Sequence, residues 1–397
     1  MCFLSLPGFL SNIDLAGSHA GGLLLSIVPL VIIALVTNDW MPFTRREFRI
    51  YLCVLFGIFI HFFFAVSVGG VVDYIYSGAL LRFTLSFLLL TIILWSVFQL
   101  ERYFSALDQT KFAQMVDTIY WSFVGLAILS LPFHFFDWVD RKQMLIFSEP
   151  SHFSVVFGPF FIYKMLSSSH RFKHLFLCLI IAFALKSVTL IAFALMGSLV
   201  SEKRYGILQI LGAICFIGAL VSFVLYFSDF FAFILDRALL SADSQNLSVL
   251  VFLSGYERAY LTMSESYLLG VGFQQMGIIG PLGQFQEAIM RLTDGFTMNK
   301  LDGGSLFSKL TTEFGIFGIF VTLAYILKAI RIFIVSRELS TYYSRELFYS
   351  ASFLSLFILI FIRSVNYFSP SCILFVIALI GLSKVTTLQT RLIKEPY

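Results

Sequence analysis

The stretch ALLRFTLSFLLLTIILWSVF, residues 79–98, decides the fold class of this chain. Its twenty residues include one charged side chain. An α-helix needs about 20 predominantly apolar residues to cross the hydrocarbon core of a bilayer. Such a helix satisfies its own backbone hydrogen bonds, which lipid cannot do for it. The stretch therefore predicts a transmembrane helix.

The whole chain has the same apolar character. Of its 397 residues, 59% are hydrophobic and 13% are charged, whereas soluble chains are about 45–50% apolar and about 25% charged. This composition excludes a water-soluble enzyme. The net charge of +4, with Lys and Arg in short clusters, argues against nucleic acid as a partner. We expect an all-α polytopic membrane protein whose main partner is the lipid bilayer.

Eleven apolar runs are expected to be membrane spans. They are residues 20–37, 50–68, 79–98, 116–136, 152–166, 174–186, 187–200, 206–227, 306–328, 347–363 and 369–385. The pair at 174–200 is short for two spans. A single span there would place Lys186 at mid-bilayer, at a cost of about 2.5–3.5 kcal/mol. We therefore expect two short helices with Lys186 at their turn.

The basic residues orient these spans. With two passes at 174–200, one side of the membrane collects 17 of the 27 Lys and Arg residues. These are Arg45, Arg46, Arg49, Arg102, Lys111, Lys164, Arg171, Lys173, Lys203, Arg204, Lys328, Arg331, Arg337, Arg345, Lys384, Arg391 and Lys394. Cytoplasmic segments carry an excess of positive charge. The N-terminus is therefore expected outside and the C-terminus inside.

This topology divides the chain into three parts. Residues 1–227 are expected to hold the first eight spans, 228–303 a large external loop, and 304–397 the last three spans with a cytoplasmic C-terminus. The loop contains aromatic residues throughout but no Cys and no His. Loops of this length are usually functional or disordered. Because of its aromatic and aliphatic content, we expect this loop to fold.

A first group of chemically interesting residues precedes the fifth span, in the sequence Ser-Glu-Pro-Ser-His at 148–152. Ser and Pro typically begin a helix, and a carboxylate there is favoured by the helix dipole. Glu149 and His152 are therefore either part of a helix cap or groups facing a water-filled cavity. Arg141 lies just upstream, where it either contacts a phosphate or belongs to a solvated turn.

A second group lies in the large loop, around Arg258. Tyr256 and Tyr260 are four residues apart, so a helix would place them on one face. The sequence Leu-Gly-Val-Gly-Phe follows at 269–273, and its glycines indicate a turn or a close backbone approach. The alternative is an arginine on the loop surface that pairs with a neighbouring glutamate.

Two more groups lie where the chain returns to the membrane. Asp302 precedes a span that carries Lys309 and Glu313, which are spaced to pair with each other on a helix. Arg363 lies at the external end of the tenth span, where it either snorkels to the interface or binds a lipid diphosphate. All four groups face the external side in the expected topology.

Three of these stretches resemble the bacterial O-antigen polymerases of the Wzy type, within the O-antigen ligase and polymerase superfamily. They are FSEPSHFS at 147–154, YER at 256–258 leading to LGVGF at 269–273, and DGGS at 302–305 leading to EFGIFG at 313–318. The arrangement of many spans with one large loop late in the chain is also similar. The likeness covers residues 140–370, and the first third matches as generic spans.

The resemblance implies a glycosyltransferase of the bacterial inner membrane with its active site in the periplasm. Its substrates would be undecaprenyl-diphosphate-linked oligosaccharide repeat units, which it joins into the polysaccharide of lipopolysaccharide. A chain-length regulator protein is a further candidate partner. We expect Glu149, Arg258 and Asp302 to be catalytic, with Glu149 and then Asp302 as the base. The expected substrate-binding residues are Arg141, Arg363, His152, Tyr256, Tyr260, Lys309 and Glu313.

Two other functions stay open at this point. The related O-antigen ligases resemble this scaffold but need a His in the large loop, which is absent here. A lipid-linked glycan flippase or transporter would use central ionisable residues as a pathway, and the large loop counts against it. No cofactor is expected. The carboxylates are scattered and no HExxH motif is present, so no metal site is expected either.

Overall fold

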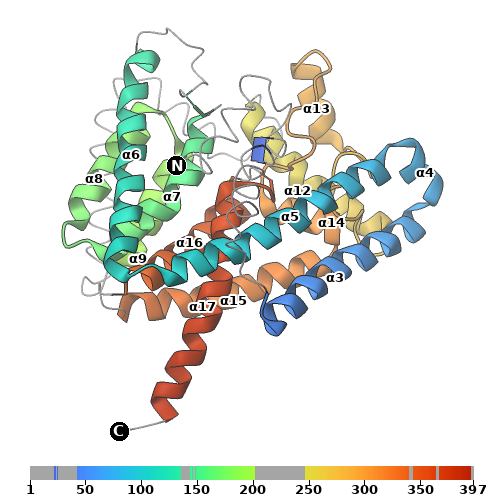
Figure 1. Cartoon of the computed structure of the whole chain (residues 1–397). Coiled ribbons are helices and arrows are strands. Elements are labelled where there is room, and N and C mark those ends of the chain that lie inside the picture. Colours follow the sequence, from blue (N-terminus) through green and yellow to red (C-terminus); the bar gives the residue numbers. More distant parts are fainter. Residues whose placement is uncertain are drawn as a thin grey trace.

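The structure is a computed structural model of the whole chain. It describes residues 22–23, 25, 43–135, 144, 146–147, 149–201, 246–338, 343–363 and 366–394. Almost all of these residues belong to helices (Figure 1). The helices are α3 (Arg45–Gly69), α4 (Val71–Tyr76), α5 (Ala79–Ala106), α6 (Gln109–Phe135), α7 (Pro150–Ser167), α8 (Arg171–Ala184), α9 (Val188–Ser201), α12 (Leu247–Glu265), α13 (Gln284–Leu292), α14 (Leu306–Phe314), α15 (Ile316–Glu338), α16 (Ser344–Phe361) and α17 (Pro370–Lys394).

The predicted all-α class is confirmed for the described residues. Five of their helices are long and apolar enough to cross a membrane: α3, α5, α6, α15 and α16. Two further apolar segments, α9 and the first part of α17, are shorter. Four of the five long helices bury a third or less of their apolar window inside the protein, whereas α16 buries 83%. Their exposed apolar surface requires lipid around it, so the chain is a membrane protein.

The expected count of eleven spans is only partly covered by the described residues. The predicted span at 206–227 and the loop segment 228–245 lie outside the described residues. Of the predicted span at 20–37, only residues 22, 23 and 25 are described. The described part of the predicted loop, residues 246–303, holds the helices α12 and α13.

The doubtful region at 174–200 forms two helices, as expected. Leu185, Lys186 and Ser187 lie between α8 and α9, and Lys186 has a φ of +51°. The Ser187 hydroxyl lies 2.8 Å from the Ser154 hydroxyl, one turn into α7. The Arg171 side chain binds the carbonyl of Ser201, so the outer ends of α8 and α9 meet. The two helices therefore form a hairpin against α7.

The predicted ninth span, 306–328, differs from the structure because it is not one helix. It is divided at Gly315 into α14 and α15. Gly315 has a φ of +56°, and a Cβ there would lie 1.9 Å from the carbonyl oxygen of Leu268. A side chain cannot be placed so close to backbone, so glycine is required at this break. The break separates α14 from the membrane-spanning helix α15. Helix α14 therefore lies beside the loop.

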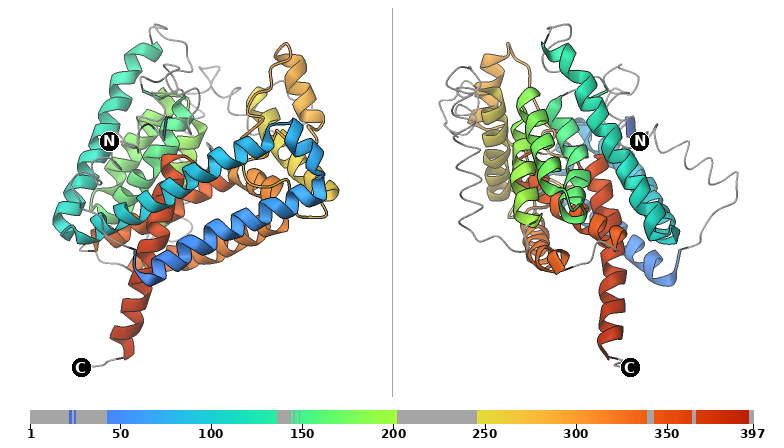
Figure 2. Two further views of the ribbon diagram at one scale, coloured as in Figure 1. Left: turned by 45° about the vertical axis from the view of Figure 1, so that its right-hand side comes forward. Right: turned by 90° about the vertical axis from the view of Figure 1, so that its left-hand side faces the viewer.

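The helices form two groups with α16 between them. Figure 1 shows α6, α7, α8 and α9 on one side, and α3, α4 and α12–α14 on the other. The left view of Figure 2 shows α3 and α5 joined through α4 and running back from it in opposite chain directions, and the two helices also contact each other. Helix α16 packs against both α7 and α17, which makes it the centre of the described bundle.

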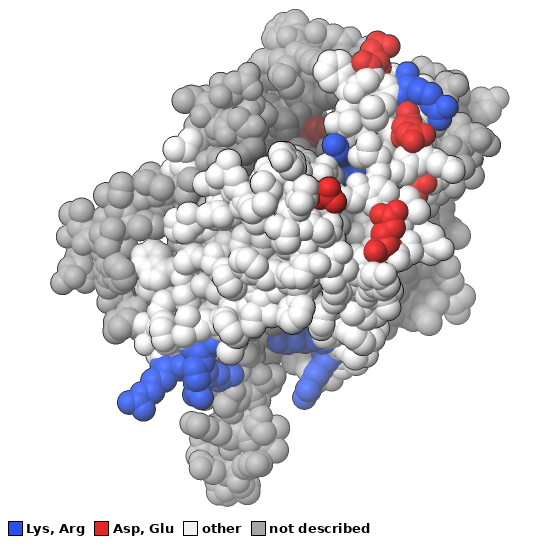
Figure 3. All heavy atoms as spheres, turned by 90° about the vertical axis from the view of Figure 1, so that its right-hand side faces the viewer, with Lys and Arg blue, Asp and Glu red and all other residues white. Residues whose placement is uncertain are grey.

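One end of the bundle is rich in basic residues, and we call it the basic end. Arg102 at the end of α5 pairs with Glu47 at the start of α3. Arg345 at the start of α16 donates to the carbonyl of Ser105 at 2.7 Å. Figure 3 shows Lys and Arg gathered along one edge below a broad band without charged side chains. A band of this kind fits the hydrocarbon layer of a bilayer.

The opposite end of the bundle carries the residues 246–315, and we call it the loop end. Here the Tyr74 hydroxyl of α4 donates to the carbonyl of Val271 at 2.8 Å. The Gln275 side chain donates to the carbonyl of Ala79 at the start of α5, at 3.2 Å. The turn 269–276 is therefore hydrogen-bonded directly to α4 and to the start of α5.

Candidate functional site

An ion pair at the loop end joins two of the predicted site residues. Arg363 Nη2 lies 2.9 Å from Glu149 Oε2, across 214 positions of sequence. Glu149 is the N-cap of α7, and Pro150 takes the first helical position. The Ser151 hydroxyl also donates to Glu149 Oε2, at 2.8 Å. The Glu149 side chain is 40% exposed and that of Arg363 19%, so both are accessible to a bound substrate.

A second polar network begins at Asn366 and leads into the loop. Asn366, three residues after Arg363, accepts a hydrogen bond from the Gln274 side chain at 3.1 Å. The backbone N–H of Gln274 donates to Glu313 Oε2 at 2.9 Å. The backbone N–H of Met276 reaches the other carboxylate oxygen at 3.4 Å. Glu313 of α14 is therefore linked to Asn366 through the turn at 274–276.

Glu313 and Lys309 form an ion pair that is completely buried. Lys309 Nζ lies 2.9 Å from Glu313 Oε1, and both side chains are 0% exposed. Lys309 also donates to the carbonyl of Leu301 at 2.6 Å and lies 5.2 Å from the centre of the Tyr367 ring. Buried charges require such partners to offset their desolvation. The pair fixes α14, the 299–304 turn and the start of α17 relative to one another.

The Tyr367 hydroxyl is buried among acidic groups. Burial raises its pKa well above the ordinary value, and the carboxylates of Glu313 and Asp302 raise it further. One carboxylate oxygen of Asp302 is buried without a hydrogen bond, and so is the Tyr367 hydroxyl. The structure thus brings Asp302 close to the buried pair. Ser305, not Asp302, caps α14 by accepting from the N–H of Ser308 at 3.2 Å.

Arg258 is almost fully buried, with 1% of its surface exposed. Its guanidinium binds the carbonyl of Lys300 and the side chain of Gln286, the latter at 3.3 Å. Burial lowers its pKa to about 10, so it remains charged at neutral pH. Arg258 therefore joins α12 to α13 and to the turn that contains Asp302. This position suits a residue that holds the site together more than one that touches a substrate.

The residues next to Arg258 differ in their surroundings. Tyr256 is half-buried and contacts the ring of Phe307, whereas Tyr260 is 74% exposed. Glu257 does not pair with Arg258, because its carboxylate accepts from the N–H groups of Gln284 and Phe285, both at 2.9 Å. It thereby caps α13. The alternative of a surface Arg258 paired with a neighbouring glutamate therefore does not match the structure.

Two predicted site residues remain, His152 and Arg141. His152 lies in the first turn of α7, where its N–H donates to the carbonyl of Glu149 at 3.1 Å. Arg141 lies outside the described residues. Nine of the ten predicted site residues therefore lie at the loop end of the bundle: Glu149, His152, Tyr256, Arg258, Tyr260, Asp302, Lys309, Glu313 and Arg363.

Sequence reasoning missed two glutamines that join these groups. Gln274 and Gln275 are both buried, and Gln274 adopts a φ of +61°, which is uncommon for a residue with a side chain. Neighbouring Gly272 and Gly277 also have positive φ. Two amides inside a glycine-rich turn were the available signal, since polar side chains there have to find partners once buried.

The site offers charges of both signs at the boundary of an apolar bundle. An exposed carboxylate can accept a proton, and an arginine fork can hold phosphate oxygens. Among the described residues, no cluster of three or more His, Cys, Asp or Glu side chains could hold a metal ion. The arrangement therefore suits a reaction in which an anionic group leaves and a hydroxyl is deprotonated.

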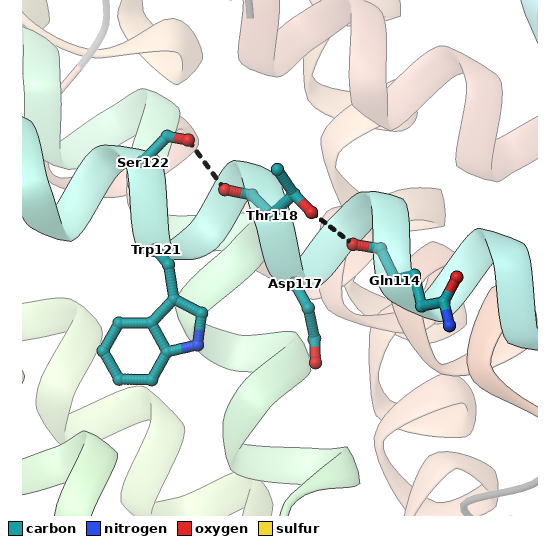
Figure 4. Close-up of a pocket in the computed structure, with 5 residues that line it drawn as sticks. All are labelled: Gln114, Asp117, Thr118, Trp121 and Ser122. Carbon is teal, nitrogen blue, oxygen red and sulfur yellow. Dashed lines mark hydrogen bonds between the residues drawn. The ribbon is translucent and has the colours of Figure 1, made fainter.

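Two surface hollows lie away from these residues. One, of about 600 Å³, is very open and is lined by Gln114, Asp117, Thr118, Trp121 and Ser122. Figure 4 shows that all five side chains come from α6, where Thr118 and Ser122 bind carbonyls one turn earlier. Asp117 is neutralised by Lys164 of α7, near the basic end. The second hollow is apolar and lies between α3 and α5.

No protein-family model and no curated protein matches this chain.

Proposed function

We propose that this chain is a membrane glycosyltransferase that joins lipid-diphosphate-linked oligosaccharide repeat units, that is, an O-antigen polymerase. The reaction would take place at the periplasmic face of the bacterial inner membrane. The proposal rests on the resemblance of three short stretches and on one observation from the structure. That observation is the presence at the loop end of two groups of charged residues, the Glu149–Arg363 ion pair and the buried network around Lys309 and Glu313.

The position of these two groups suits the proposed reaction. They lie at the end opposite the basic residues, and basic ends of membrane proteins are typically cytoplasmic. A lipid-linked substrate would keep its hydrocarbon chain in the bilayer and present its diphosphate and sugars at this level. A folded segment, 246–315, covers the same end of the bundle. The hydrocarbon chain would thus stay in the bilayer, the diphosphate would reach the charged residues, and the glycan would contact the segment 246–315.

The roles follow from exposure and charge. A hydroxyl of the acceptor sugar attacks the anomeric carbon of the donor glycan, and the bond to the diphosphate breaks. Glu149 is proposed as the base that takes the hydroxyl proton, because its carboxylate is 40% exposed and thus accessible to an acceptor hydroxyl. Arg363 is proposed to bind the departing diphosphate, whose charge increases as it leaves. Undecaprenyl diphosphate would be the second product.

The buried residues would support these two. Lys309, Glu313 and Arg258 hold the turn 299–304 and thus Asp302, which remains the second candidate for the base. Positioning of this kind is effective because small displacements of reacting groups reduce rates strongly. Tyr260, which is exposed on α12, remains a candidate for contact with the glycan.

Deletion of the gene tests the proposal. The expected result is lipopolysaccharide whose core carries a single repeat unit, with longer chains restored by the wild-type gene. A core without any repeat unit, together with accumulation of lipid-linked polymer, would instead identify a ligase. Loss of all external repeat units, with the units retained inside the cell, would identify a flippase.

A further inference from the structure

An acidic residue of α6 is exposed on the outer surface of the described bundle. Asp117 lies in the part of α6 that is long and apolar enough to cross a membrane, and its side chain is 44% exposed. One carboxylate oxygen binds Lys164 of α7, and the other accepts no hydrogen bond from a described residue. Ionisable side chains of membrane helices usually face the bundle interior or a water-filled cavity. Asp117 therefore has room for a further polar partner from outside the bundle.

The larger surface hollow, of about 600 Å³, lies at this carboxylate. Its described lining is Gln114, Asp117, Thr118, Trp121 and Ser122. Figure 4 shows Asp117 and Trp121 on the same side of α6. Thr118 and Ser122 donate to carbonyls one turn earlier, both at 2.8 Å, so their hydroxyl protons are already used. The carboxylate, the Gln114 amide and the indole N–H are therefore the groups that can bind a ligand here.

A lysine of α8 supplies the opposite charge beside Trp121. Lys173 Nζ lies 5.9 Å from the centre of the Trp121 ring. The Lys173 side chain is exposed and pairs with no acid in the part of the chain that the structure describes. The Trp121 ring also contacts the buried His174 ring, with 6.0 Å between their centres. This contact fixes the start of α8 against Trp121 and holds Lys173 at the hollow.

The order of these groups along α6 corresponds to the order of charges in one kind of lipid. Helix α6 begins at the basic end, where the Gln109 side chain accepts from the N–H of Arg345. Asp117 therefore lies nearer that end, and Trp121 lies about one turn, roughly 5.4 Å, deeper. A phospholipid with an amine carries its phosphate on the hydrocarbon side and its ammonium on the water side. Each charge of such a head group would thus meet its opposite.

Apolar side chains continue from the hollow toward the middle of the membrane. Ile128 and Leu129 are exposed further along α6, and Phe176 and Ile180 are exposed on α8. Phe176 and Ile180 follow Lys173 by three and seven residues, which places all three on one face of the helix. The fatty acyl chains of a lipid held at the hollow would pack against these residues.

We propose that this hollow binds the head group of an amine-bearing phospholipid, of which phosphatidylethanolamine is the simplest. Asp117 and Gln114 bind the ammonium, and Lys173 and the Trp121 N–H bind the phosphate. A primary ammonium offers three N–H donors, whereas the trimethylated amine of phosphatidylcholine offers none. Phosphatidylglycerol has no cation for Asp117. Lipid binding at this end is separate from glycan transfer, so the proposal does not rest on the proposed function.

The test is native mass spectrometry of the purified full chain, titrated with phosphatidylethanolamine, phosphatidylcholine and phosphatidylglycerol of the same acyl chains. The wild type should bind the first molecule of phosphatidylethanolamine about 10-fold more tightly than either competitor, the usual effect of a hydrogen bond to a charged group. Asp117→Asn should instead favour phosphatidylglycerol, because Lys164 and Lys173 then face the hollow without a carboxylate. Lys173→Gln should weaken binding of phosphatidylethanolamine about 10-fold. Arg331→Gln, which removes an exposed base of α15 at the same end, serves as the control and should bind as the wild type does.

Three results would overturn the proposal. The first is equal affinity of the wild type for the three lipids, and the second is an unchanged lipid preference in Asp117→Asn. The third is a dimer that persists at every lipid concentration and is lost in Asp117→Asn, since a second copy of the chain would then cover the hollow.

A second measurement uses the wild-type protein alone, so that misfolding of a variant cannot affect it. The protein is placed in phosphatidylcholine nanodiscs with about one molecule per protein of phosphatidylethanolamine that carries a diazirine in its acyl chain. Light should attach this probe to peptides from 121–132 of α6 or 172–184 of α8. Labelling confined to α3 or α15 would contradict the assignment of the hollow.

Discussion

The buried ion pair of Lys309 and Glu313 gives the sharpest prediction about how the loop end is held together. In Glu313→Gln, the Lys309 ammonium would remain 0% exposed and lose its partner at 2.9 Å. Removing one member of a buried ion pair typically costs about 3–5 kcal/mol, because the other charge stays buried. The glutamine oxygen can still accept from the N–H of Gln274, so the loss of charge dominates the effect.

A double variant separates this charge effect from a simple loss of packing. Lys309→Met combined with Glu313→Gln removes both charges and keeps an acceptor for Gln274. Replacing both members of a buried pair is often close to neutral. The double variant should therefore be more stable than Glu313→Gln alone, with a coupling energy of at least about 1 kcal/mol.

The assay is thermal unfolding of the purified protein in detergent, with the four proteins of the cycle compared under one condition. The wild type should melt highest, the double variant next and both single variants lowest. A Glu313→Gln protein that melts with the wild type would refute the reasoning. So would a double variant that melts at the sum of the two single losses, since the charges would then not interact.

Three further predictions concern residues around this pair. Arg363→Ala and Glu149→Gln should each abolish long glycan chains while melting close to the wild type, because a partly exposed ion pair contributes only about 0–1 kcal/mol; the repeat-length ladder and the melting curve together test this, and a normal ladder would remove both from the active site. Arg258→Lys should lose roughly 1–3 kcal/mol of stability and shorten the ladder, because one ammonium cannot reproduce the fork that reaches Lys300 and Gln286; full stability in the same melting assay would contradict its positioning role. Gly255→Ala should reduce folded protein in membranes, since its Cβ would lie 1.8 Å from the carbonyl oxygen of Gly303, and unchanged abundance on a blot would show that α12 does not pack against this turn as described.

The apolar runs were enough to predict the helical class and several helix positions. The run at 79–98 lies within α5, and the break near Lys186 follows from the cost of a charge at mid-bilayer. The break at Gly315 was missed because an apolar run looks continuous in sequence whether or not the backbone turns. Its cause is a tertiary contact with Leu268, which no local pattern records.

The site was predictable by residue type but not by arrangement. Glu149 and Arg363 were found because charges next to apolar spans are conspicuous, yet their pairing across 214 positions depends on the packing of α7 and α16. Arg258 lies between Tyr256 and Tyr260 in sequence, but residues two apart on a helix point in different directions. Its guanidinium therefore lies in the protein while Tyr260 is exposed. The roles of Gln274 and Gln275 depend on the folded turn, because their side chains bind Asn366 and the carbonyl of Ala79, which are distant in sequence.

The topology of the membrane can be tested with reporter fusions. Fusions at Gln284 and Ser340 should report opposite sides of the membrane, because the basic residues near Ser340 are expected in the cytoplasm. The same side for both would mean that the loop end does not face the periplasm. The proposed access of Glu149 and Arg363 to a periplasmic substrate would then fail.

Transfer by the purified protein is the most direct measurement of its proposed activity. Lipid-linked repeat units extracted from the deletion strain would be incubated with the wild-type chain in nanodiscs, with Arg363→Ala as the matched control. We expect lipid-linked chains of two or more units and an equal release of undecaprenyl diphosphate, with neither product in the control. Repeat units that stay single, or that move only when lipid A with its core is added, would exclude a polymerase.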